Sequence, residues 1–74
     1  MITLLREYSY GWDLCNEDEP EFFSTIKQAE DELKGYIESV NLAYKQGYMS
    51  DPYEDDMKVG EVSADLVSNK WIIK

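Results

Sequence analysis

The sequence predicts an α+β domain in which three or four mostly antiparallel strands carry one long helix on one face. Three observations predict this class. The chain has 74 residues, the length of a single domain. Apolar residues recur at every third or fourth position over residues 25–46, as on one face of a helix. The segments on either side of it alternate apolar and polar residues, as strands do.

Residues 2–14 form the first alternating segment. Its large apolar side chains fall on one numerical parity: Leu4, Tyr8, Tyr10, Trp12 and Leu14. Gly11 interrupts the alternation, so the segment is either one bent strand or a short hairpin. Residues 15–21, CNEDEPE, then form a loop, because Asn16, Pro20 and the acids disfavour regular structure.

The helix is expected to run from residue 25 to residue 46. Thr25 followed by Gln28 has the form of a capping box, which marks a helix start. Gly47 is suited to the position after the last helical residue. On the polar face, Lys27 and Asp31 are four residues apart and favour an ion pair.

Residues 48–56 form a loop that contains Pro52 and four acids. A strand follows at residues 57–64, and a parity change between Val59 and Val62 predicts a bulge near Gly60. A turn at residues 65–69 leads to the last strand, KWIIK, which should pair antiparallel with the preceding one.

The predicted core joins the helix to the sheet. We expect one set of strand residues to meet one stripe of helix residues: Leu4, Tyr8, Val59, Trp71 and Ile73 against Leu33, Ile37, Val40 and Tyr44.

The chain is strongly acidic, with 16 Asp and Glu against 7 Lys and Arg and a net charge of −9. Such a surface repels nucleic acid and anionic membranes, and it attracts cations or basic protein surfaces. The simplest alternative is that the charge only keeps a small protein soluble.

Residue types that carry common chemistry are scarce. The chain has no histidine, and its one cysteine, Cys15, has no partner for an internal disulfide. A loop starting at Asp51 fails as an EF-hand, because Asp56 stands where glycine is needed and Val62 where glutamate is needed. We therefore expect no enzyme, no cofactor and no metal.

No stretch approaches the ~20 apolar residues of a membrane span. A lone cysteine fits a reducing compartment. We expect a cytoplasmic protein, monomeric or homodimeric, that does not bind membranes or nucleic acid directly.

Two acidic clusters, EDEPE at residues 17–21 and DPYEDD at residues 51–56, are the candidate binding surface. Carboxylates two residues apart on a strand lie ~6.6 Å apart, which imitates every second phosphate of a nucleic acid strand, where the rise is ~3.4 Å. The predicted contact acids are Glu17, Asp18, Glu19, Glu21, Asp51, Glu54, Asp55 and Asp56. We expect Trp12 and Tyr53 to be exposed anchors beside them, while Phe22, Phe23 and Tyr48 pack under the loops.

The run FSTIKQAEDELKGYIESVNLAYKQGYMSDPYEDDMKVGEV, residues 23–62, resembles small acidic proteins encoded by bacteriophages and other mobile elements. The shared pattern is a capped helix rich in Ala and Glu, an aromatic-glycine exit, an acidic loop and a short strand. Some proteins of this kind, among them anti-CRISPR and anti-restriction proteins, inhibit host defence by mimicking DNA. The resemblance implies an inhibitor that occupies the DNA or RNA site of a basic host protein in the host cytoplasm.

Two other functions fit the sequence. The chain could be a protein-interaction or self-associating structural module that binds through its aromatics, with the acids only for solubility. It could also be a regulator that recruits a host enzyme.

Overall fold

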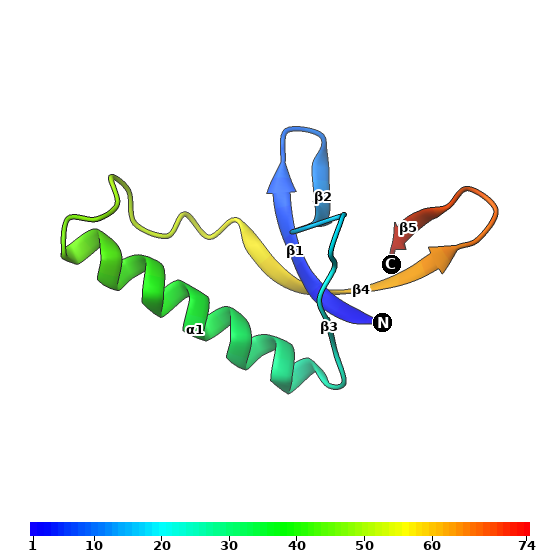
Figure 1. The fold of residues 1–74 in the computed structure, drawn as a ribbon, viewed down its shortest axis with the longest axis horizontal. Helices are drawn as coiled ribbons and strands as arrows, with labels where there is room; N and C mark the ends of the chain where they lie inside the picture. The colour runs from blue at the N-terminus through cyan, green and yellow to red at the C-terminus, as the bar shows by residue number, and fades with distance from the viewer.

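The computed structural model describes all residues from Met1 to Lys74. Its elements are, in order, β1 (Ile2–Tyr8), β2 (Gly11–Leu14), β3 (Phe22–Phe23), α1 (Ile26–Lys45), β4 (Met57–Asp65) and β5 (Lys70–Ile73). The strands form a curled antiparallel sheet with the order β2-β1-β4-β5, and β3 also pairs with β1. The helix lies along one side of this sheet (Figure 1). The predicted α+β class is confirmed.

The N-terminal segment is a hairpin, the second of the two predicted alternatives. Tyr8 of β1 pairs with Gly11 of β2, which leaves Ser9 and Tyr10 as a two-residue connection. Gly11 has a φ of +118°, which residues with a side chain rarely adopt. A glycine at this position therefore lets the chain reverse.

The ends of α1 match the prediction because local hydrogen bonds define them. The side chain of Thr25, the N-cap, accepts from the Gln28 N–H at 3.1 Å, while the Gln28 side chain accepts from the Ser24 N–H. At the other end Gly47 has a φ of +83°, and the Tyr48 N–H donates to the Ala43 carbonyl at 2.9 Å. This is the Schellman arrangement that ends a helix at glycine. The predicted pair between Lys27 and Asp31 is also present, at 3.5 Å.

β4 has no bulge, so the predicted interruption near Gly60 is wrong. Its residues 57–61 pair one for one with residues 6–2 of β1. Apolar residues switch from odd to even positions along β4 because the first part of the strand is buried on one face of the sheet and the last part on the other. Met57 contacts Arg6 on the side of the helix, whereas Val62 belongs to a cluster on the other side. A strand covered on both faces shows apolar residues at both parities.

The main cluster of buried apolar side chains lies on the face of the sheet opposite the helix, which corrects the predicted core. Leu5, Leu14 and Val62 form the buried cluster, with Trp12, Trp71 and Ile73 packed against it. Arg6, the neighbour of Leu5, reaches Tyr36 on the helix. Since successive side chains of a strand point to opposite faces, the Leu5 cluster faces away from α1.

The error in the predicted core has a geometric cause. The register pairs Leu5 with Leu14, so odd-numbered residues of β1 share a face with even-numbered residues of β2. Leu4 and Tyr8 are therefore on the opposite face from Trp12 and Leu14, and both are only half-buried. Trp71 and Ile73 are core residues as predicted, but not against the helix.

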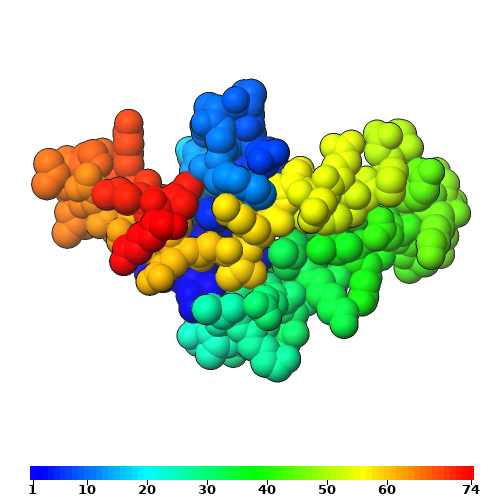
Figure 2. Space-filling view, turned by 180° about the vertical axis from the view of Figure 1, so that it is seen from behind, coloured from blue at the N-terminus to red at the C-terminus, as the bar shows by residue number.

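The molecule is elongated and its core is small. Six of its 74 residues are buried, and Ala29 is the only one of these in the helix. The radius of gyration is 13.8 Å, against about 11 Å for a compact domain of this length. Figure 2 shows the reason: the β4–β5 hairpin projects at one end, and the end of α1 with the following loop projects at the other.

Candidate protein-binding site

The acidic loop, residues 51–56, is held in place by hydrogen bonds to the helix and the sheet. The Tyr53 N–H donates to the Asn41 side chain at 3.1 Å, which ties the loop to α1. The Asp56 carbonyl accepts from the Glu7 N–H at 2.8 Å, which ties it to β1. The Tyr53 ring also meets Tyr36 edge to face at 6.4 Å. The main chain that carries the acids of this loop is therefore held in one conformation.

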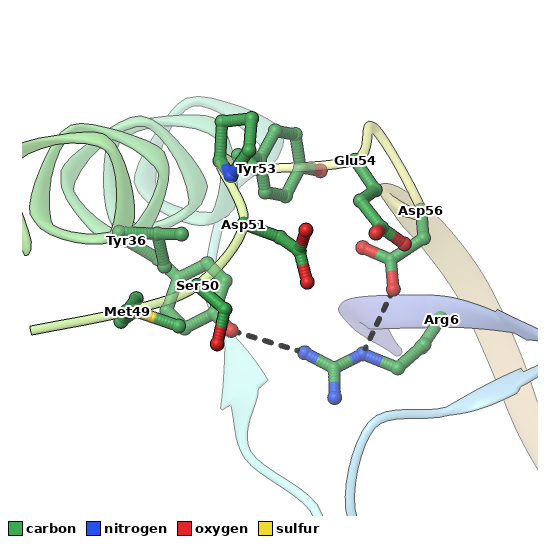
Figure 3. A pocket seen from close by; sticks show the side chains of 10 residues that line it. Arg6, Tyr36, Met49, Ser50, Asp51, Tyr53, Glu54 and Asp56 are labelled. Carbon is green, nitrogen blue, oxygen red and sulfur yellow. Dashed lines mark hydrogen bonds and ion pairs between the residues drawn. The ribbon is translucent and has the colours of Figure 1, made fainter. Parts of the chain in front are cut away.

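A pocket of about 380 Å³ opens between this loop, α1 and β1. Three of its lining residues are acids of the loop, and Figure 3 shows their carboxylates on one side of the Arg6 guanidinium, where Asp56 is the one joined to it. The labelled acids are Asp51, Glu54 and Asp56, and Tyr36 and Tyr53 also line the pocket. The pocket combines negative charge with aromatic surface, the two features that recognise cationic side chains.

Arg6 already places one guanidinium in this pocket. Its Nη2 donates to the Tyr36 hydroxyl at 3.3 Å, and its Nε lies 3.8 Å from Oδ2 of Asp56. At 3.8 Å, Arg6 and Asp56 form an ion pair, but this distance is too long for a hydrogen bond. The buried Nε of Arg6 therefore has no hydrogen-bond partner. Burial opposes the charge of Arg6, but the hydrogen bond to Tyr36 and the attraction of Asp56 outweigh it and raise its pKa.

Asp55 is exposed and, unlike the other three acids of the loop, does not line the pocket. Its φ is +58°, a left-handed conformation that Asp and Asn tolerate better than most residues. This backbone angle lets the chain turn from the loop into β4.

The second acidic cluster, residues 17–21, is ordered by different contacts. The Asn16 side chain accepts from the Asp18 and Glu19 N–H groups, both at 3.2 Å. The buried Thr3 hydroxyl donates to the Glu21 carbonyl. A hydrogen bond shared with Asp13 raises the pKa of Glu17 and lowers that of Asp13. Both side chains also line the same pocket.

The structure does not join the two acidic clusters into one pocket. Residues 17–21 follow β2 and residues 51–56 precede β4, and these two strands lie on opposite sides of β1. Glu19 and Glu21 line a second pocket, and Glu17 lines a third. Asp18 and Asp55 line none of these pockets.

The exposure of most aromatic residues differs from the prediction. Trp12 and Tyr53, expected at the surface, are half-buried. Trp12 packs against the core and its ring is covered by the Lys58 ammonium at 4.2 Å. Tyr48, expected under a loop, is 82% exposed. Phe23 is half-buried as expected, while Phe22 is partly exposed although its ring meets Trp71 at 5.0 Å.

Sequence reasoning missed two features of the surface. Arg6 pairs with Asp56, and no local pattern in the sequence indicates this contact across 50 residues. Leu66 and Val67, at the tip of the β4–β5 hairpin, are 91% and 98% exposed. Two aliphatic residues inside a predicted turn were the available signal.

Other chemistry finds little support in this geometry. No group of three or more acids and cysteines is arranged to hold a metal ion. Burial raises the pKa of the Cys15 thiol, which makes it a poorer nucleophile at neutral pH. The helix is too polar to cross a membrane.

Comparisons with models of protein families, with curated proteins and with solved structures gave no significant match.

Proposed function

We propose that this protein is an acidic inhibitor that binds a basic nucleic-acid-binding protein of the host and keeps DNA or RNA out of its site. The acidic loop is the principal contact, with Asp51, Glu54 and Asp55 at its surface. A CRISPR-associated or restriction complex is the type of host target proposed. The protein has no catalytic role in this proposal.

The observation that carries the proposal is the group of acidic-loop carboxylates that line one pocket beside the Arg6 guanidinium, with which only Asp56 pairs (Figure 3). A pocket that holds one guanidinium between Asp56 and Tyr36 has the chemistry to attract further cationic groups at its rim. Asp51 and Glu54 line that rim and have no ion pair within the chain. Their charges therefore remain available to a partner.

The order of the acidic loop also supports the proposal. A loop that is disordered before binding loses conformational entropy when it binds. Here the bonds from Tyr53 to Asn41 and from Glu7 to Asp56 fix the main chain in advance. The net charge of −9 then speeds the encounter with a basic groove, and the binding weakens as salt rises.

Capture from a bacterial lysate with matched variants tests this function. The test variant is Asp51→Asn/Glu54→Gln/Asp55→Asn, which removes three charges and keeps the Asp56 pair with Arg6. The control is Glu30→Gln/Glu32→Gln/Glu38→Gln, which removes the same charge from α1. We expect the wild type and the control to retain a nucleic-acid-binding protein, and the test variant to bind it about tenfold more weakly.

The captured protein then has to meet two further conditions. Its complex should dissociate between low and moderate salt, and duplex DNA or RNA should compete with this protein for it. The proposal fails if the acidic-loop variant binds as tightly as the wild type, or if nucleic acid and this protein bind the target together.

A second candidate function is a protein-interaction module that binds through apolar contacts. The exposure of Tyr48, Leu66 and Val67 favours it, rather than the half-buried Trp12 and Tyr53. Binding that hardly changes with salt and is lost in a Leu66→Ser/Val67→Ser variant would support this module instead of the inhibitor.

A further inference from the structure

β5 is an edge strand with hydrogen-bonding groups that face no other strand. The Lys74 N–H donates to the Glu61 carbonyl at 3.0 Å, so residues 74, 72 and 70 direct their main-chain groups toward β4. By the same alternation, Trp71 and Ile73 direct their N–H and C=O groups away from β4. β5 pairs with no other strand, so these groups form an open edge.

Two other edge positions of the sheet are occupied by side chains of the chain itself. On β2, the Leu14 N–H donates to the Asp13 carboxylate at 2.8 Å, and the Leu14 carbonyl accepts from the Tyr8 hydroxyl at 3.2 Å. On β4, the Tyr53 hydroxyl bonds both main-chain groups of Met57. Proteins commonly protect edges from pairing in such ways. Among the edge positions just compared, β5 lacks this protection.

A groove of about 430 Å³ runs beside β5, because the curl of the sheet brings its two edge strands to the same hollow. β2 and the loop after it contribute Asp13, Leu14 and Glu17, and the β5 side contributes Asn69, Lys70 and Trp71. The groove therefore offers apolar surface, carboxylates and an open strand edge together.

The charges of the groove favour a basic occupant. Asp13 and Glu17 both line the groove, and Lys70 on the other wall is the only base among its lining residues. Lys70 makes no ion pair with either acid. One negative charge remains in surplus, and the protein as a whole carries −9. A cationic side chain between Asp13 and Glu17 would relieve the repulsion between them.

Charge opposes a second copy of the chain at this edge. In the register centred on Ile72, antiparallel pairing of two β5 strands would place Lys70 opposite Lys74 of the second copy. Like charges directly opposite each other destabilise a strand pair, and two chains of charge −9 also repel each other.

We propose that the β5 edge binds an extended segment of a partner protein by strand addition, with a basic side chain of that segment between Asp13 and Glu17. The main-chain groups of Trp71 and Ile73 hold the segment, and the two carboxylates select the basic residue. This surface is separate from the acidic loop, so it goes beyond the proposed function and can be tested without it.

The probe is a set of random peptides of about ten residues, the upper length of an ordinary strand, selected for binding to the intact protein. We expect selected peptides to alternate apolar residues and to carry a Lys or Arg at a fixed place. In the complex, hydrogen exchange of the Trp71 and Ile73 N–H groups should slow, because the peptide now accepts from them.

Two matched changes locate the contact. Two forms of the peptide are N-methylated at alternate residues, one at the odd and one at the even positions. One form should bind about tenfold more weakly and the other nearly as well as the unmodified peptide, because only one set of N–H groups faces β5. Glu17→Gln should weaken binding roughly threefold, whereas Glu38→Gln on α1 should not. The proposal is overturned if no peptide is enriched, if enriched peptides lack a basic residue, or if the two N-methylated forms of the peptide bind with the same affinity.

Discussion

The hydroxyl of Tyr53 lies against both main-chain groups of Met57, at 3.2 Å from its nitrogen and 3.4 Å from its carbonyl oxygen. It accepts from the N–H and donates to the carbonyl, as a neighbouring strand would. A single side chain thus pairs with both main-chain groups of the first residue of β4, and it fixes the acidic loop to the sheet.

Tyr53→Phe should destabilise the protein by about 1–3 kcal/mol, the cost of leaving partly buried polar groups without a partner. Urea unfolding followed by circular dichroism measures this change. Tyr48→Phe is the control, because the Tyr48 side chain is 82% exposed and makes no hydrogen bond. Equal stability of the two variants would mean that water replaces the Tyr53 hydroxyl at no cost.

Gly60→Ala should destabilise the protein by about 1–3 kcal/mol, as overpacking of a core does. A Cβ at position 60 would lie 2.2 Å from Cδ1 and 2.8 Å from Cγ of Leu5. Leu5 is 1% exposed and packs in the buried cluster, so its side chain has to displace core neighbours to make room.

Gly35→Ala is the matched control for this substitution. It lies within α1, and its Cβ would meet nothing within 4 Å. It should stabilise the protein by about 0.5–1 kcal/mol through the better helix propensity of alanine. The thermal midpoints of the two variants should therefore move in opposite directions, and a shared direction would contradict the packing of Leu5 on Gly60.

Leu5→Ala and Leu4→Ala test which face of β1 carries the core. Leu5 belongs to the buried cluster, and its truncation should cost about 2–5 kcal/mol. Leu4 is half-buried on the opposite face, so its truncation should cost clearly less. Urea unfolding measures the free energy of unfolding of both variants. A larger decrease for Leu4→Ala than for Leu5→Ala would mean that the core lies on the face of β1 that carries Leu4.

The carboxyl groups of Asp13 and Glu17 should titrate in opposite directions from their ordinary values. Their shared hydrogen bond raises the pKa of Glu17 and lowers that of Asp13, which the Leu14 N–H and the Tyr10 hydroxyl also stabilise as an anion. NMR titration of the carboxyl carbons measures both. In Asp13→Asn, the pKa of Glu17 should return toward that of an ordinary glutamate, whereas Glu19→Gln should leave it unchanged.

The sign of the effect on stability follows from these directions. The raised pKa of Glu17 contributes stability below its unfolded pKa, and this is lost as pH rises through its folded pKa. The lowered pKa of Asp13 contributes stability above its unfolded pKa, and this is lost as pH falls through its folded pKa. The two contributions therefore oppose each other across the acidic range.

Local patterns were sufficient to predict α1. Thr25 with Gln28 and the glycine at position 47 act on neighbouring main-chain groups, so its ends followed from residues within one turn. The C-terminal hairpin and the acidic loop were also predictable, since Pro52 and the pair of close C-terminal strands signal them over short distances. At the N-terminus, Gly11 left a bent strand and a hairpin as alternatives, and the strand pairing decided for the hairpin.

The faces of the sheet and the contents of the acidic pocket were decided by tertiary structure. Leu4 and Leu5 are identical in type, so alternation alone could not choose between them, and the pairing of Leu5 with Leu14 made the choice. Arg6 meets the loop at residue 56 only because β1 and β4 pair in one register. The sequence by itself determined the elements that depend on nearby residues, and the long-range strand register determined which side chains share a face, because a shift of one residue moves every side chain to the other side.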